Sequence, residues 1–160
     1  MMDTIFRKLP LFKGKQRLAR ILLKNKIREN KNFWIKGKFG CEYRVPNVVE
    51  NIGFEIFING IYEKATSDFI INRLPRNGVY LDFGANIGAI AIPVQTRRKD
   101  VKIVCVEAAP WVYHFLKQNL ERNNLTEVIA LNNALFNVDD KTVNIYSPEE
   151  KFGKGYLSPV

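Results

Sequence analysis

The sequence has few residues that bind transition metals and no apolar run long enough to cross a membrane. It contains one histidine, too few for a histidine-rich zinc site, and neither cysteine has a histidine or cysteine nearby at metal-ligand spacing. No apolar run approaches the roughly 18–20 residues that span a bilayer, and no signal peptide is recognisable at the N-terminus. These absences predict a cytoplasmic protein without a metal site.

The histidine and the two cysteines are expected to have structural positions and no catalytic or metal-binding role. Cys41 and Cys105 each lie in a strand-like run, where a buried free thiol is the simpler interpretation and a disulfide between them stays open. His114 lies in a predicted helix beside Trp111 and Phe115, on which a lone histidine belongs to the packing or to the surface.

Positive charge is concentrated at one end of the chain. Residues 1–40 contain 12 Lys or Arg and two acidic residues, a net charge of +10, whereas the remaining residues have a net charge of −1. So local an excess does not indicate a nucleic-acid-binding domain, and no specific nucleic-acid partner is expected. A basic helix is predicted over residues 15–28, with Leu18, Ile21 and Leu22 on its apolar side. The positive charge of this arm could instead bring it into peripheral contact with an anionic membrane surface.

Residues 1–14 are expected to be irregular, and the segment after the basic helix is predicted to be mostly β-structure. NFWIKGKFGCEYRV has two β-rich runs broken by glycines and predicts a hairpin. FEIFING predicts a third strand, and IYEKATSDFIINRL predicts a helix. We therefore expect an arm of basic helix and hairpin over residues 1–45 and a second domain over residues 46–160.

From Gly78 onward, short apolar runs alternate with amphipathic segments. Their order is strand, helix, strand, helix, strand, which predicts an α/β fold with parallel strands joined by crossover helices. The five segments are GVYLDFG, NIGAIAIPVQTRR, VKIVCVEA, PWVYHFLKQNLERNN and EVIALNNAL. One further strand, KTVNIYS, and an irregular tail are expected to follow.

Two features at the ends of the first two strands indicate a ligand site. Asp82 ends the first strand, Gly84 makes the turn, and Gly88 lies at the start of the following helix, whose free N–H groups favour an anionic group. Glu107 ends the second strand, 19 residues after Gly88, where an acid can accept hydrogen bonds from both hydroxyls of a ribose.

The glycine spacing favours one nucleoside cofactor over another. A dinucleotide turn has three glycines, and here Ala85 and Asn86 stand where the middle glycine would make room for pyrophosphate. An aspartate two residues before Gly84 suits the ammonium group of a methionine moiety. S-adenosylmethionine is therefore the preferred cofactor, and a dinucleotide-binding module remains an alternative.

At this point the sequence resembles a known family. LDFGANIG is similar to the Asp-x-Gly-Ala-Asn-x-Gly motif of FkbM-family methyltransferases. The resemblance extends through NGIYEKATSDFI before it and through VCVEAAPWVYHFLKQNLERNN and ALNNALFNVDDKTVNIYS after it. It implies a Rossmann-like methyltransferase fold that uses S-adenosylmethionine, most often for O-methylation of a sugar or natural-product hydroxyl, so that the partner would be a small-molecule or glycan acceptor.

The resemblance also implies a set of cofactor-binding residues. Residues around the methionine end would come from the glycine turn, Glu107 would bind the ribose, and Ala134 would lie near the adenine. The turn residues are Asp82, Gly84, Ala85, Asn86 and Gly88. Tyr62 and Glu63 are candidates for proton removal, but a packed tyrosine and a surface acid are an equal interpretation, so the catalytic residue is left unknown.

The sequence departs from this family at three points. EAAP stands where the family has Glu-Pro, and Pro93 lies inside the predicted first helix, where a kink is expected. The family's sheet continues with further strands, so the fold is expected to be incomplete, with an open sheet edge that could form a homodimer. A non-catalytic cofactor-binding or interaction remnant is the competing hypothesis.

Overall fold

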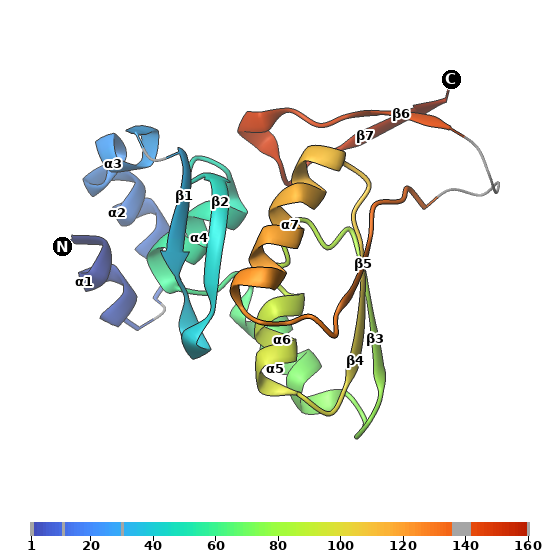
Figure 1. Ribbon diagram of the computed structural model, residues 1–160. Coiled ribbons are helices and arrows are strands. Elements are labelled where there is room, and N and C mark those ends of the chain that lie inside the picture. Colours follow the sequence, from blue (N-terminus) through green and yellow to red (C-terminus); the bar gives the residue numbers. More distant parts are fainter. Residues whose placement is uncertain (1, 11, 30, 136–141, 160) are drawn as a thin grey trace.

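A parallel three-stranded sheet forms the centre of the computed structural model, which describes residues 2–10, 12–29, 31–135 and 142–159. Its strands are β3 (Val79–Phe83), β4 (Lys102–Val106) and β5 (Ile129–Leu131), in the order β3-β4-β5. In register, Leu81 lies beside Val104, and Val104 beside Ile129. Helices α6 (Ala91–Arg97) and α7 (Pro110–Arg122) connect the strands (Figure 1). The predicted α/β fold with a parallel βαβαβ core is confirmed, and it is Rossmann-like.

The helices cover only one face of this sheet. Figure 1 shows α5 (Lys64–Arg73), α6 and α7 together on the side that faces the N-terminal elements. Among the described residues, the opposite face leaves large apolar side chains exposed. They are Val79, Leu81 and Phe83 of β3 and Ile129 and Leu131 of β5. The helix predicted for IYEKATSDFIINRL is confirmed as α5.

The N-terminal hairpin is held to the sheet layer by asparagine side chains. Strands β1 (Lys31–Lys36) and β2 (Glu42–Asn47) pair antiparallel, as predicted. On the outer edge of β2, Asn119 of α7 accepts from Arg44 N at 2.6 Å and donates to Arg44 O at 3.1 Å. Asn123 does the same for Glu42, at 2.8 and 2.7 Å. Two amides therefore satisfy a strand edge that would otherwise need another strand.

The prediction of a strand over FEIFING is wrong, because these residues belong to helix α4 (Asn51–Asn59). The Glu50 carboxylate caps the helix by accepting from Ile52 N at 2.7 Å, and Gly60 ends it with a φ of 74°. Ile52, Phe54, Ile56, Phe57 and Ile58 are all buried, so the helix is apolar around most of its circumference. Such a helix has no helical period to detect, and its aromatic and β-branched residues favoured the strand.

The predicted basic helix differs from the structure in extent and in its buried face. It forms two helices, α2 (Lys15–Leu22) and α3 (Lys24–Glu29), and the segment before them, expected to be irregular, contains α1 (Met2–Lys8). Ala19, Leu23 and Ile27 are buried at a spacing of four, whereas Leu18, Leu22 and Ile21 are exposed. The small Ala19 side chain allows close approach to the body, and the expected apolar side of Leu18, Ile21 and Leu22 lies outside this contact.

Pro93 lies in the first turn of its helix, and not in the helix interior where it was expected to cause a kink. The predicted helix began at Asn86, but α6 begins at Ala91, after a turn, which makes Pro93 its third residue. The N–H groups of a first helical turn have no partner within the helix, so a proline there costs no hydrogen bond.

The chain beyond β5 adds a small antiparallel sheet. β5 is shorter than the predicted strand, and β6 (Val143–Tyr146) is the expected further strand. β6 pairs with β7 (Tyr156–Pro159), which lies in the tail that was expected to be irregular. Short 3₁₀ turns lie at Lys38–Gly40 and Glu149–Lys151. None of the described helices combines the length and apolarity needed to cross a membrane.

Candidate functional site

The glycine turn after β3 is fixed to the end of β4. Gly84 N and Ala85 N both donate to Val106 O, at 2.9 and 3.0 Å, so the chain reverses beside the last residue of the neighbouring strand. This brings the turn next to Glu107, the residue that follows Val106. In open parallel α/β sheets, ligands bind at this carboxyl edge of the strands.

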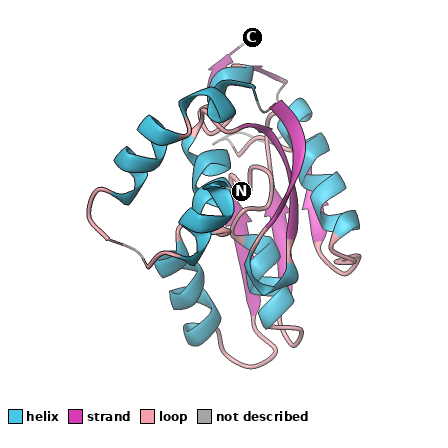
Figure 2. Cartoon of the chain, turned by 90° about the vertical axis from the view of Figure 1, so that its left-hand side faces the viewer, coloured by secondary structure: helices cyan, strands magenta, loops and turns pink. Residues whose placement is uncertain are grey.

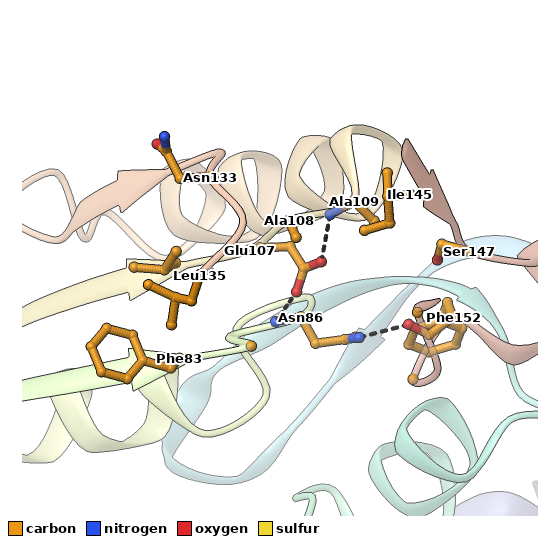
Figure 3. A pocket seen from close by; sticks show the side chains of 14 residues that line it. Phe83, Asn86, Glu107, Ala108, Ala109, Asn133, Leu135, Ile145, Ser147 and Phe152 are labelled. Atoms are coloured by element: carbon orange, nitrogen blue, oxygen red, sulfur yellow. Dashed lines mark hydrogen bonds between the residues drawn. The ribbon is translucent and has the colours of Figure 1, made fainter. Parts of the chain in front are cut away.

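Glu107 holds the centre of the site. Its side chain is 8% exposed, and its two oxygens accept from Asn86 N and from Ala109 N, each at 2.9 Å (Figure 3). A carboxylate has about four lone-pair positions, so each oxygen keeps one for a ligand donor. One acid therefore fixes two loops and can still accept from two neighbouring hydroxyl groups.

Glycine is required at the two positions of the turn for different physical reasons. Both have a left-handed backbone, with φ of +77° at Gly84 and +82° at Gly88. A Cβ on Gly84 would meet no atom within 4 Å, whereas a Cβ on Gly88 would lie 2.9 Å from Ile92 Cδ1 and 3.0 Å from Leu116 Cδ1. Gly84 thus leaves open space above the turn, and Gly88 allows α6 and α7 to pack closely.

Asn86 links the turn to the C-terminal segment. Its φ of 52° is left-handed, a conformation that asparagine tolerates better than most residues. Its Oδ1 accepts from Ile87 N at 3.0 Å, and its Nδ2 donates to Phe152 O at 2.7 Å (Figure 3). The C-terminal segment therefore forms one wall of the site.

A cavity of about 350 Å³ lies above these residues, within the usual range for small-molecule sites. Figure 3 shows Glu107 and Asn86 side by side in its lining, joined by the hydrogen bond from Asn86 N. Of the predicted site residues, Gly84, Asn86 and Glu107 line it; Asp82, Ala85 and Gly88 support the turn behind it. Ala134 does not line it, although its neighbours Asn133 and Leu135 do. The other lining residues are Phe83, Val106, Ala108, Ala109, Ile145, Ser147, Phe152, Gly153 and Gly155.

Sequence reasoning missed most of this wall. Phe83, Ala108 and Ile145 are ordinary apolar residues, and Phe152 contributes through its backbone and ring from a tail that was expected to be irregular. No motif marks such residues, since any apolar side chain of suitable size would serve. Tyr62 and Glu63, the candidates for proton removal, do not line this cavity.

Asp82 is a buried carboxylate with an unused oxygen. Its Oδ1 accepts from the Tyr80 hydroxyl at 3.3 Å, and its Oδ2 is buried with no hydrogen-bond partner among the described residues. Burial raises the pKa of Asp82 above its ordinary value of 3.8; the Tyr80 hydroxyl opposes this rise and the charge of Glu107 adds to it. The structure holds this acid beside Gly84 at a cost in stability, which is typical of a functional group.

Replacing Asp82 with asparagine is expected to raise the midpoint of thermal unfolding at pH 7. Because the folded-state pKa is raised, the folded protein holds this proton more tightly than the unfolded chain. The free energy of unfolding therefore falls as pH rises from 3.8 through the folded-state pKa. The amide does not ionise, so the gain should vanish below pH 3.8.

The matched control is Glu127→Gln. Glu127 is about half-exposed and lies 3.9 Å from Lys99, so removing its charge should leave the unfolding midpoint nearly unchanged. A lower midpoint for Asp82→Asn than for the wild type at pH 7 would contradict the assignment of a strained, buried carboxylate.

The remaining candidates take no part in this cavity. Cys41 and Cys105 are buried free thiols, as expected, and burial raises the pKa of both. His114 is exposed, with its Nε2 2.8 Å from Gln118 Nε2. Within the described part of the chain, no three His, Cys, Asp or Glu side chains form a metal-binding group.

Comparison with known proteins identifies a family of methyltransferase domains. The family model of the TRM5/TYW2 methyltransferase domain matches residues 39–149. A curated relative from Methanocaldococcus jannaschii, tRNA(Phe) (4-demethylwyosine(37)-C(7)) aminocarboxypropyltransferase, is 26% identical over 125 residues. That alignment covers 77% of this chain and 45% of the relative, so the chain spans less than half the length of the relative it matches.

Two solved structures are similar to this chain over part of their length. M. jannaschii TYW2 in complex with AdoMet is 22% identical, with a TM-score of 0.49, over 64% of this chain and 43% of that chain. The complex of aTrm5 with tRNALeu is also 22% identical, with a TM-score of 0.49, over 71% of this chain and 31% of that chain.

These comparisons correct two predictions. Membership of the FkbM family is wrong, because the matching family model describes a different group of methyltransferases. The expectation of a sugar or natural-product acceptor without nucleic acid is also contradicted, because the curated relative is named for a tRNA substrate. The local charge excess was a poor argument against nucleic acid, since a small basic arm beside a nearly neutral domain can still contact phosphates.

Proposed function

Because the chain belongs to the TRM5/TYW2 methyltransferase domain family, we propose that it binds S-adenosylmethionine and transfers a carbon group from it to tRNA. The observation that carries this proposal is the family match over residues 39–149, which includes the glycine turn and Glu107. The cofactor lies at the carboxyl ends of β3 and β4, in the cavity of about 350 Å³.

The residues of the site fit this cofactor. Asp82 does not line the cavity, but it lies two residues before Gly84, which does. Its buried Oδ2 has no hydrogen-bond partner among the described residues and is an acceptor that suits an ammonium group. The spare lone pairs of Glu107 suit the two ribose hydroxyls. The open space above Gly84 lets a ligand approach the backbone. The ammonium group and the ribose of S-adenosylmethionine therefore each have a matching acid at this edge of the sheet.

The chemistry divides between cofactor and protein. S-adenosylmethionine supplies an electrophilic carbon on a sulfonium sulfur. The side chains described here bind and orient it, and Phe83, Leu135 and Ile145 give one side of the cavity an apolar lining. Glu107 is the one acidic side chain among the described residues that line this cavity, and it is assigned to the ribose. The acceptor's proton therefore leaves to a group outside this set.

Two groups could be transferred, and the relatives differ on this point. The family is described as a methyltransferase domain, whereas the curated relative is named an aminocarboxypropyltransferase. Both groups are bonded to the same sulfonium sulfur, and the acceptor's position decides which carbon is attacked. We propose transfer to a tRNA base as the common function.

Isotope labelling tests this function and identifies the group. The chain is incubated with two acceptors, an unmodified tRNA(Phe) transcript and tRNA(Phe) that carries 4-demethylwyosine at position 37, the base for which the curated relative is named. Each is combined with S-adenosylmethionine that carries radioactive carbon in either the methyl or the carboxyl group. Label in tRNA from the methyl carbon alone indicates methyl transfer, and label from the carboxyl carbon alone indicates aminocarboxypropyl transfer. Label from neither, with a folded chain that binds S-adenosylhomocysteine, contradicts the transferase proposal.

Replacing Gly84 with alanine is expected to weaken S-adenosylhomocysteine binding at least about tenfold, since a methyl group would occupy space that the ligand needs. Gly40→Ala is the matched control: its φ of +76° and the open space around it resemble those of Gly84. Both variants should lose roughly 1–2 kcal/mol of stability from left-handed strain. Calorimetric titration should show weaker binding for Gly84→Ala alone; equal affinities would contradict the close approach.

A further inference from the structure

A second cavity, of about 870 Å³, lies between the N-terminal hairpin, the first half of α7 and the C-terminal segment. It shares no lining residue with the cavity beside Glu107, and the proposed cofactor site does not use it. In Figure 1 the C-terminal strands lie above α7, and Figure 2 shows the C-terminus at the same end of the molecule. We call this the aromatic cavity; its lining residues are Lys31, Asn32, Pro46, Asn47, Val49, Trp111, His114, Phe115, Glu149 and Glu150.

One stretch of chain contributes to both cavities. Ser147 lines the cofactor cavity, and Glu149 and Glu150 line the aromatic cavity. The stretch is fixed at two points, because Trp111 Nε1 donates to Ser147 O at 3.1 Å and Asn47 Nδ2 donates to Glu149 O at 2.8 Å. A group bound in the aromatic cavity is therefore held against the segment that forms a wall of the cofactor site.

Three aromatic residues form the α7 side of this cavity. Trp111, His114 and Phe115 are spaced at i, i+3 and i+4, which places them on one side of the helix. The rings of Trp111 and His114 both meet Phe115 edge-on, with centroids 6.2 and 6.5 Å from its own. None of the three residues is fully buried. Such a surface suits stacking on a flat ring or contact with a cation.

Positive charge already present disfavours the cation. Lys31 lines the cavity and has no hydrogen-bond or ion-pair partner among the described residues. The guanidinium carbon of Arg44 lies 5.8 Å from the ring centroid of Phe115. Hydrogen bonds to Asn32 Oδ1 at 2.7 Å and to Gln118 Oε1 at 2.9 Å hold Arg44 there. A second cation would be repelled by both groups, whereas a neutral aromatic ring would not.

The C-terminal wall of the cavity offers hydrogen-bond acceptors. Glu149 and Glu150 are exposed, and their carboxylates have no hydrogen-bond or ion-pair partner within the described part of the chain. An ionised carboxylate only accepts, so a matching ligand brings N–H or O–H donors. Of the four RNA bases, guanine alone has two neighbouring donors on its pairing edge, the ring N–H and the amino group. One carboxylate can accept from both at once.

We propose that the aromatic cavity binds an unpaired guanine of the RNA acceptor. The base stacks on the rings of Trp111 and Phe115, and its pairing edge donates to Glu149 or Glu150. Unpaired bases of RNA are recognised by this combination of stacking and edge contacts. The inference rests on the proposed function, since it names part of the tRNA contact. Because the C-terminal segment separates the two cavities, this guanine positions the RNA and is not the base that receives the carbon group.

Tryptophan fluorescence tests the site directly. The chain has two tryptophans, so Trp34→Phe leaves Trp111 as the single reporter. Oligouridine RNAs of about ten nucleotides with one central guanosine, inosine or adenosine are titrated into this variant. The guanosine RNA is expected to quench Trp111 and to bind roughly tenfold more tightly than the adenosine RNA. Inosine lacks the amino group and should bind with intermediate affinity.

A double variant with its control tests the acceptor wall. Replacing Glu149 and Glu150 together with glutamine should remove most of the preference for guanosine over adenosine. Replacing Glu121 and Glu127 with glutamine removes the same charge at two exposed positions outside the cavity and should keep the preference. Because the ratio of two affinities is compared, a general gain in RNA binding from the lost negative charge cancels.

A second pair of variants tests the stacking. Phe115→Leu is expected to weaken binding of the guanosine RNA roughly tenfold. Phe69→Leu, which removes a 65% exposed ring of α5 outside the cavity, should not. Affinity for S-adenosylhomocysteine, measured by calorimetry, should be unchanged in both variants and reports an intact cofactor site.

The outcomes separate this inference from the proposed function. Equal affinities for the guanosine and adenosine RNAs, or a preference that survives loss of Glu149 and Glu150, overturn the guanine site and leave the isotope-label test of tRNA modification unaffected. Quenching of Trp111 by a tetra-arginine peptide and not by RNA assigns the cavity to a cation and overturns it as well. A guanosine preference without isotope label in tRNA supports the RNA site and overturns the transferase proposal alone.

Discussion

Replacing Glu107 with alanine is expected to weaken S-adenosylhomocysteine binding by at least about 100-fold. Hydrogen bonds to a charged group contribute roughly 1.5–3 kcal/mol each, and two ribose hydroxyls would lose their acceptor. The substitution also leaves Asn86 N and Ala109 N without their shared partner, so the two loops that form the site lose their connection. The sum corresponds to a loss of two or more powers of ten in affinity.

Calorimetric titration of three variants separates these contributions. Glu107→Gln keeps one carbonyl acceptor and should bind better than Glu107→Ala but worse than the wild type. Glu127→Ala removes an acid from a half-exposed site far from the turn in sequence and should bind as the wild type does. Wild-type affinity in a folded Glu107→Ala protein would overturn the assignment of this residue to the ribose.

Replacing Asn119 with alanine is expected to lower the free energy of unfolding by about 3–5 kcal/mol, a large part of the stability of a domain of this size. Its side chain is 0% exposed and makes three hydrogen bonds, to Arg44 N, to Arg44 O and to Ile87 O at 2.9 Å. Alanine would leave three buried backbone groups unpaired, at roughly 1–3 kcal/mol each before relaxation.

Asn123→Ala provides the matched comparison. This residue makes the same pair of bonds to Glu42 N and Glu42 O, but its side chain is only partly buried, so water can replace it. We expect a loss of about 1 kcal/mol for this variant by urea denaturation. An equal loss of unfolding free energy in Asn119→Ala and Asn123→Ala would show that burial of the side chain does not determine the size of the loss.

The parts of this protein that sequence predicts well are those with a local physical signal. The order of the parallel strands, the hairpin over residues 31–47 and the helix beginning at Pro110 each follow from periodicity and turn residues. Gly84 and Glu107 were expected to lie together because the carboxyl ends of adjacent parallel strands share one edge. The structure brings them together as two walls of one cavity.

The parts that sequence predicts poorly depend on what surrounds a segment. Helix α4 resembles a strand in composition, and only its caps and its burial on most sides make it a helix. In the basic arm, the buried stripe includes Ala19 rather than the larger Leu18 because packing against the body favours the smaller side chain. The segment around Phe152 became part of the site through contacts distant in sequence.

The error in family has a chemical origin. The motif LDFGANIG and the acid at position 107 describe a nucleoside cofactor, and proteins that share this cofactor share these residues whatever they modify. The acceptor is chosen by other surfaces of such a protein, which have no short motif. A cofactor motif therefore predicts the fold and the cofactor better than it predicts the substrate.

The spacing of Asn119 and Asn123 along helix α7 is close to the spacing of Arg44 and Glu42 along strand β2. Residues four apart on a helix advance about 6.0 Å along its axis, and residues two apart on a strand advance about 6.6 Å. Asn119 and Asn123 can therefore face Arg44 and Glu42 at the same time, with the helix axis running along the strand. If strand β2 shifted by one residue along α7, Asn119 and Asn123 would both lose their hydrogen-bond partners. Helix α7 therefore fixes a single register of the hairpin against the sheet layer.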